Sequence, residues 1–123
     1  MTEGYDGRQV VGMDLHRWRS VLVRMTEDGR RLETVRITSS PAALRAVIAR
    51  AGKNPRVVLE AAYGWYWAVD LLEAAAAEVH LAHRRVKNDE RDASDVAGLL
   101  RMGRLPEAWI APPEIRVRFG RLA

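Results

Sequence analysis

The order of its hydrophobic segments is the feature that most constrains the fold of this chain. Residues 10–15 are apolar apart from one acid, residues 20–25 are rich in β-branched side chains, and residues 31–38 alternate polar and apolar side chains. All three patterns are typical of extended strands. Gly29 supplies a turn between the last two. Consecutive strands joined by such short connections predict an antiparallel meander.

Helical and extended segments alternate after the meander. Ser40 followed by Pro41 indicates a helix start, because serine caps helices and proline fits their first turn, and Gly52 is expected to end this helix. The remaining pattern predicts a strand at 56–60, a helix at 65–77, a strand at 78–82 and a helix at 88–102. The resulting order, β-β-β-α-β-α-β-α, predicts an α/β protein with the mixed sheet of the RNase H-like fold.

The length of 123 residues allows one domain at most. We expect a disordered lead at 1–9, the RNase H-like domain at 10–104 and a proline-containing C-terminal extension at 105–123. No apolar run approaches the roughly 18 residues that cross a bilayer, and the polar start is unlike a signal peptide. The absence of cysteine excludes disulfides and thiolate metal sites. A cytoplasmic location without a membrane partner is therefore expected.

The charge of the chain favours a polyanionic partner. The formal net charge is +4, and of the 20 basic residues only Lys53 and Lys87 are lysine. Arginine suits bidentate contacts with phosphate better than lysine does, and a positive protein attracts nucleic acid. A genome rich in G and C, whose codons favour arginine, would explain the same excess.

Four carboxylates stand out by their positions. Asp14 lies in the first predicted strand, Glu60 ends the fourth, and Asp89 and Asp92 are three residues apart at the start of the third helix, where they share a face. An acid inside an apolar strand is costly unless something compensates it, and acids brought together repel one another. A divalent cation removes both problems.

Magnesium, or manganese in its place, prefers hard oxygen ligands. Two such ions about 3.5–4 Å apart can clamp the attacking and leaving oxygens of a phosphodiester. Each acid alone has a plainer interpretation: Asp14 as a solvent-facing strand end, Glu60 as an acid meeting a helix N-terminus, and Asp89 as a helix cap with Asp92 in the first turn. Taken together, two strand-end acids and a helical pair predict a metal site.

Three segments carry a family resemblance: GMDLHR at 12–17, VLEA at 58–61, and KNDERDA at 87–93, which answers a Lys-x-Asp-x-x-Asp-Ala motif. With the Leu-Pro stretch that follows, they resemble the N-terminal domain of the DEDD-type transposases of the insertion sequence 110 family, which includes the pilin-gene invertases. The resemblance covers about residues 10–115. It implies a RuvC-like domain whose catalytic acids and metal ligands for Mg²⁺ (or Mn²⁺) are Asp14, Glu60, Asp89 and Asp92.

The resemblance also implies a function in DNA transposition and site-specific recombination. The implied partners are the DNA of the mobile element and its target, a structured guide RNA, and further copies in a homo-oligomer. Full-length members add a coiled coil and a domain bearing a nucleophilic serine, so we interpret this chain as truncated before that domain. The link at 83–87 is shorter than in the family, and it decides whether Asp89 and Asp92 reach Asp14 and Glu60.

Several basic residues are candidates for nucleic-acid contact, with a solvated turn or loop as the alternative: Arg17, Arg84, Arg85, Lys87 and Arg91. The aromatic cluster at 63–67 is expected to dock on the sheet rather than to stack on bases. A catalytically inactive nucleic-acid-binding remnant is the alternative to a transposase domain. An actin-like or sugar-kinase-like ATPase is less consistent, because it needs a glycine-rich turn after the first strand and residues 15–18 contain no glycine.

Overall fold

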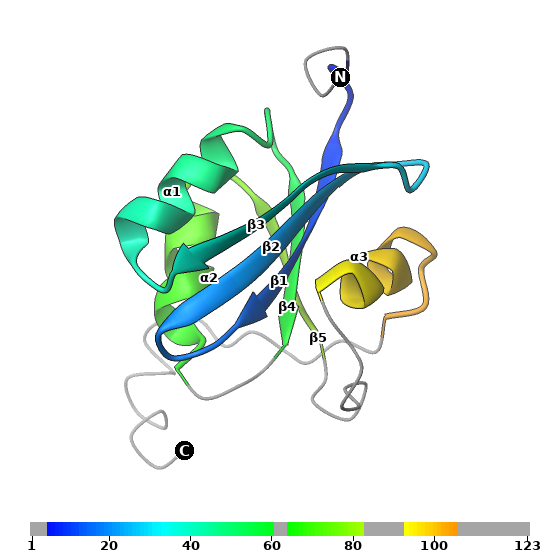
Figure 1. Ribbon diagram of the computed structural model, residues 1–123. Helices are drawn as coiled ribbons and strands as arrows, with labels where there is room; N and C mark the ends of the chain where they lie inside the picture. The colour runs from blue at the N-terminus through cyan, green and yellow to red at the C-terminus, as the bar shows by residue number, and fades with distance from the viewer. Residues whose placement is uncertain (1–4, 61–63, 83–92, 106–123) are drawn as a thin grey trace.

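A five-stranded mixed sheet with the order β3-β2-β1-β4-β5 forms the centre of the molecule (Figure 1). This computed structural model describes residues 5–60, 64–82 and 93–105. Strand β1 pairs antiparallel with β2, and β2 with β3, which confirms the predicted meander. Strand β4 runs parallel to β1, and β5 parallel to β4. The strands are β1 (Gln9–Leu15), β2 (Arg19–Thr26), β3 (Arg31–Thr38), β4 (Arg56–Glu60) and β5 (Glu78–Ala82).

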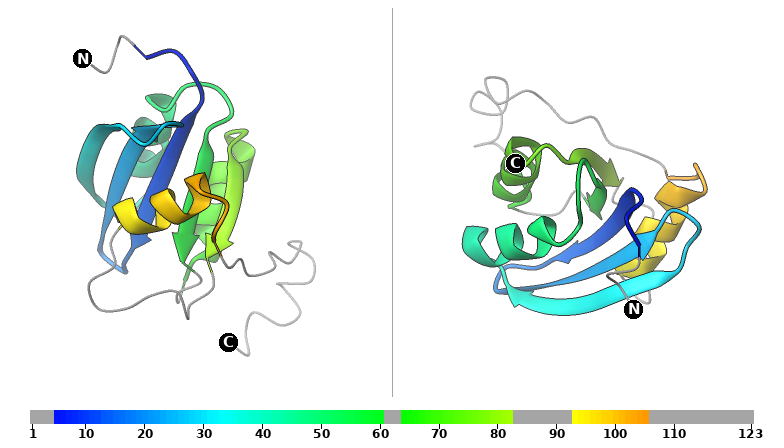
Figure 2. Two further views of the ribbon diagram at one scale, coloured as in Figure 1. Left: turned by 90° about the vertical axis from the view of Figure 1, so that its right-hand side faces the viewer. Right: turned by 90° about the horizontal axis from the view of Figure 1, so that it is seen from above.

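Helices cover both faces of the sheet, so that the molecule has three layers (Figure 2). One face carries α1 (Pro41–Ala49) and α2 (Tyr66–Ala74), and the other carries α3 (Ala93–Arg101). Successive side chains of a strand point to opposite faces, so β1 divides between two cores. Val11 and Met13 pack in the core on the α1 and α2 side, whereas Val10 packs in the core under α3. The observed element order is the predicted one.

The two helices on the first face differ in how well the sequence predicts their ends. Helix α1 starts as expected, since the Ser40 hydroxyl accepts a hydrogen bond of 3.3 Å from the amide of Ala43. Helix α2 was predicted to reach residue 77 but ends at Ala74. Ala76 adopts a left-handed backbone with φ 65, and the Ala77 amide bonds to the Leu72 carbonyl at 3.0 Å. This is a Schellman C-cap built on alanine, without the glycine that usually marks it.

Helix α3 lies closer to the sheet than an ordinary side chain would allow. It buries Ala93, Val96, Ala97 and Leu100, which share one helical face. A Cβ atom on Gly12 of β1 would lie 1.9 Å from the carbonyl oxygen of Ala93. Glycine at this position therefore lets the first turn of α3 rest on the strand. The predicted start of this helix, at residue 88, lies outside the described residues.

A buried arginine links the strands at the end of the sheet where β1 begins. The Arg24 side chain is only 6% exposed and donates hydrogen bonds to Glu33 Oε1 and Gln9 Oε1, each at 2.7 Å. It also donates to the carbonyl of Arg50, the C-cap of α1, at 3.1 Å. Burial raises the pKa of Glu33, but hydrogen bonds from Arg50 and Arg24 outweigh it and hold that pKa below its ordinary value. Three strands and α1 thus share one network of charges.

In the part of the chain that the structure describes, no helix is long and apolar enough to span a membrane.

Candidate functional site at the ends of β1 and β4

The carboxyl ends of two parallel strands bring two of the predicted acids to the same place. Met13 of β1 lies opposite Leu59 of β4 in the parallel register, and Asp14 and Glu60 are the next residues along each strand. Met13 and Leu59 pack in the core on the α1 and α2 side. Because side chains alternate, Asp14 and Glu60 face the other side, which α3 covers. Both are partly buried.

Asp14 has a histidine neighbour two residues further along the chain. His16 Nε2 lies 3.1 Å from Asp14 Oδ1, with 57% of the histidine side chain and 29% of the aspartate side chain exposed. A half-exposed pair of this kind adds little to stability. The pair leaves the Asp14 carboxylate open to solvent.

The start of α3 lies at the same end of the sheet. Ala93, the first residue of the helix, contacts Gly12, which precedes Asp14 by two residues and shares its face of β1. Asp89 and Asp92 lie outside the described residues, as do the predicted nucleic-acid contacts Arg84, Arg85, Lys87 and Arg91. Among the acidic and histidine side chains that the structure describes, no three gather into a metal-binding group. The described structure therefore brings together two of the four predicted acids.

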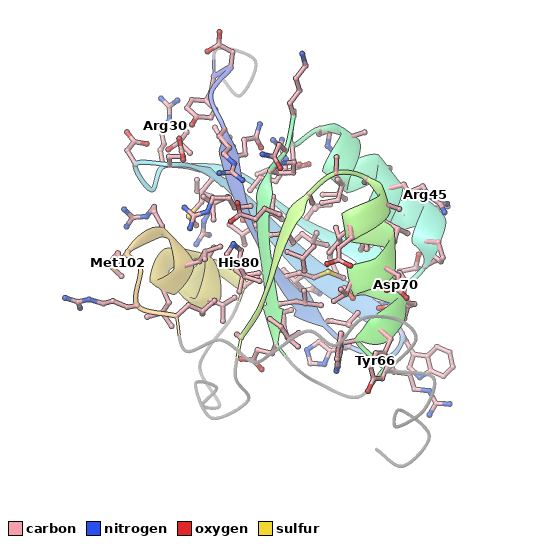
Figure 3. The ribbon with its side chains drawn as sticks, turned by 180° about the vertical axis from the view of Figure 1, so that it is seen from behind. Arg30, Arg45, Tyr66, Asp70, His80 and Met102 are labelled. Atoms are coloured by element: carbon pink, nitrogen blue, oxygen red, sulfur yellow. The ribbon has the colours of Figure 1, made fainter. Side chains whose placement is uncertain are left out.

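A histidine also lies on the α3 side of the sheet, further from the strand ends. His80 of β5 stands opposite Val58, and Figure 3 shows it on the same side as Met102 at the end of α3. Its imidazole contacts the carboxylate of Glu78. Arg8 also bonds to Glu78, at 2.8 Å, and this hydrogen bond, followed by the one from His80, lowers the pKa of Glu78 to about 2. The geometry makes His80 a structural partner of Glu78.

Asp14 opens into a pocket of about 660 Å³ with a basic lining. Arg17, Arg19 and Arg36 line it together with Trp18, and all four side chains are exposed. The guanidinium carbon of Arg17 lies 4.8 Å from the centroid of the Trp18 ring, in the range of a cation–π contact. The predicted candidate Arg17 therefore lies beside Asp14.

Sequence reasoning missed the other basic and aromatic residues of this pocket. Trp18 and Arg19 could have been found, because an aromatic side chain between arginines in a short turn is an unusual arrangement. Arg36 could not, because it reaches the pocket only through the pairing of β3 with β2, which sets it opposite Val21. Sequence proximity to Asp14 carries no information about that register.

The aromatic cluster after β4 packs as expected. Trp65 and Trp67 are partly buried against the core formed by α1, α2 and the sheet. The ring of Tyr66 lies 4.2 Å from that of Trp65, centroid to centroid. Tyr63 lies outside the described residues. These side chains thus serve the attachment of α2, which confirms the prediction for Trp65 and Trp67.

A comparison with solved structures identifies the fold. The chain is similar to T. thermophilus RuvC, determined in complex with a Holliday junction substrate, with a TM-score of 0.53 and 13% sequence identity over 83% of this chain and 100% of that chain. At this identity the likeness establishes the architecture alone: the chain has an RNase H-like, RuvC-like fold. Neither a protein-family model nor a curated protein sequence matches the chain.

Proposed function

We propose that this chain is the N-terminal DNA-binding, metal-dependent domain of a DEDD-type insertion-sequence transposase, acting in DNA transposition and site-specific recombination. The observation that carries the proposal is the placement of Asp14 and Glu60 at neighbouring ends of β1 and β4. In an open α/β sheet the carboxyl ends of the strands are the usual position of a ligand site. The RuvC-like fold supports a nucleic acid as that ligand.

The chemistry of the two carboxylates fits a magnesium or manganese site. Both supply hard oxygen ligands, and the proposal assigns the remaining ligands to Asp89 and Asp92. The contact of Ala93 with Gly12 supports this assignment, because Asp92 directly precedes Ala93 in the chain. When bound, the metal would activate the attacking oxygen and stabilise the leaving oxygen of a phosphodiester.

The residues of the chain would bind and orient the phosphodiester. His16 lies against the carboxylate of Asp14, and the arginines of the pocket would offset its negative charge, so that a phosphodiester can approach. The family resemblance extends the proposal to the DNA of a mobile element and its target, to a guide RNA and to a homo-oligomer. These three partners stay predictions.

Metal-dependent cleavage of branched DNA tests the proposal. The chain should cleave a labelled four-way junction in Mg²⁺ or Mn²⁺, and Asp14→Asn and Glu60→Gln should each abolish cleavage. Asp70→Asn and Glu73→Gln are matched controls, because these exposed acids lie on α2, across the sheet from the site. Both controls should cleave as the wild type does.

Calorimetry provides a readout that does not depend on turnover. The wild-type chain should bind Mn²⁺, and Asp14→Asn and Glu60→Gln should weaken that binding while the two α2 controls leave it unchanged. A wild-type chain that binds branched DNA but neither Mg²⁺ nor Mn²⁺ would be a nucleic-acid-binding remnant, and the catalytic proposal would fail.

A further inference from the structure

An exposed tryptophan stands at the entrance of the site. Trp18, in the turn between β1 and β2, is 74% exposed. A large aromatic ring in water costs free energy that packing would recover. Among the residues that the structure describes, Trp18 belongs to neither hydrophobic core, whereas Trp65 and Trp67 pack against one. Its exposed ring is therefore available to a ligand.

The turn that carries Trp18 is held in place. Ser39, in the link between β3 and α1, donates from its backbone amide to the Trp18 carbonyl at 2.9 Å and from its hydroxyl to the His16 carbonyl at 2.6 Å. The Ser39 hydroxyl also lies 2.7 Å from that of Ser20. A ligand that meets this turn meets a pre-organised surface, which lowers the entropy cost of binding.

The charge around the ring defines the ligand. Arg17 stacks on Trp18, and Arg19 and Arg36 line the same pocket, so three positive charges share one pocket with the aromatic ring. An aromatic platform beside a track of arginines is the arrangement that holds single-stranded nucleic acid, with bases on the ring and phosphates on the cations.

We propose that Trp18, with Arg17, Arg19 and Arg36, binds an unpaired nucleotide of a DNA strand whose backbone runs past Asp14. The base stacks on the face of the Trp18 indole opposite Arg17, and the arginines contact the flanking phosphates. This inference rests on the proposed function, because it identifies which part of a branched DNA the site selects: the unpaired nucleotide at a branch rather than a continuous duplex. Trp18 acts in strand binding, and Asp14 and Glu60 remain the acids of the metal site.

Fluorescence anisotropy with labelled DNA tests the proposal on the full chain, in EDTA so that no cleavage occurs. Trp18→Ala should weaken binding to a single strand or a four-way junction by about tenfold, the usual effect of losing one stacking platform. Trp18→Phe, which keeps an aromatic face, should stay within about threefold of the wild type. Met102→Ala is the matched control: Met102 is also an exposed large apolar residue, at 52%, but follows the end of α3, and its loss should change nothing.

Two further measurements separate stacking from charge. A strand of the same length without bases should bind wild-type chain and Trp18→Ala equally, because the ring then has nothing to stack on. The dependence of affinity on salt should be the same for Trp18→Ala and wild type, whereas Arg17→Ala should lower its slope by about 0.7, the contribution of one phosphate contact on a single strand.

The outcomes distinguish this inference from the proposed function. If Trp18→Ala binds single strands and junctions as tightly as the wild type while Asp14→Asn still abolishes cleavage, the stacking site is refuted and the nuclease proposal stands. If Trp18→Ala weakens strand binding but the wild-type chain binds no metal, the stacking site stands and the catalytic proposal falls. The proposal is overturned if Trp18→Ala also binds the baseless strand more weakly than the wild type does. It is equally overturned if the loss of affinity is confined to an RNA strand of the same sequence. Circular dichroism must show that each variant is folded. The exposure of the Trp18 and Met102 side chains favours this result for their variants.

Discussion

Replacing Gly12 by alanine should separate α3 from the sheet. The new Cβ would lie 1.9 Å from the Ala93 carbonyl oxygen, whereas such atoms are essentially never closer than 3.0 Å, so the helix must retreat by about 1.1 Å. The nearest atoms are backbone atoms, which cannot rotate away as a side chain could. Overpacking of this kind typically costs about 1–3 kcal/mol. For a chain of this size we expect the melting temperature to fall by roughly 3–15 °C.

The same displacement should reach the proposed metal site. Ala93 directly follows Asp92, so a retreat of about 1 Å would misplace a proposed ligand, and errors of that size can cost on the order of a hundredfold in rate. Thermal unfolding, Mn²⁺ calorimetry and junction cleavage measure the three effects on one variant. A drop in cleavage without a drop in melting temperature would show that the helix did not move and that the steric account is wrong.

Gly98→Ala is the matched control for Gly12→Ala. Gly98 lies within α3, and a Cβ there would have nothing within 4 Å. Alanine favours a helix interior over glycine by about 0.8–1.0 kcal/mol, so this variant should melt at a higher temperature. The close approach of α3 to β1 does not exist if both glycine variants have the same melting temperature. It is also refuted if Gly12→Ala has the melting temperature and the Mn²⁺ affinity of the wild type.

Two further perturbations concern the charged groups outside the site. Arg24→Ala should lower the free energy of unfolding by about 2–4 kcal/mol in urea, because it leaves Glu33 and Gln9 without their buried donor; a loss below about 1 kcal/mol would contradict the role assigned to that network. Glu78 has its pKa lowered from 4.5 to about 2 by Arg8 and His80, so its ionised form stabilises the fold above pH 4.5 and this contribution is lost as the pH falls towards 2. Stability measured from pH 5 to 2 should therefore fall less steeply for Glu78→Gln than for the wild type, and equal slopes would argue against the interaction.

The strands were predictable because each carries its pattern locally. The apolar run of β1 and the alternation of β3 need no knowledge of the rest of the chain. Where the outcome depends on tertiary contacts, sequence reasoning failed. Helix α2 ends early because Ala76 turns left-handed, although alanine is the best helix former. Arg24 gave no sign of burial, since its partners come from β1, β3 and the end of α1.

In the candidate site, too, the features with a local sequence pattern were predicted and those set by tertiary contacts were not. Asp14 and Glu60 were predicted from their strand ends, and the parallel register explains why they come together. The basic and aromatic surface beside them was missed. The exposure of Trp18 depends on the turn between β1 and β2, and the position of Arg36 depends on the pairing of β3 with β2. The close contact at Gly12 was equally hidden, since a glycine in a strand does not reveal what lies above it.

The order of the strands in the sheet also predicts the order in which they fold. Strand β1 meets β2 after a turn of three residues, but meets β4 only across a long stretch of chain, since Val10 pairs with Arg56. Closing the longer loop costs more chain entropy, so the meander should form first and β4 should dock later. Pulsed hydrogen exchange would then protect amides in the β1–β2 hairpin before those of β4. Asp14 and Glu60 therefore belong to segments that order at different times, and they would meet only when β4 docks on β1.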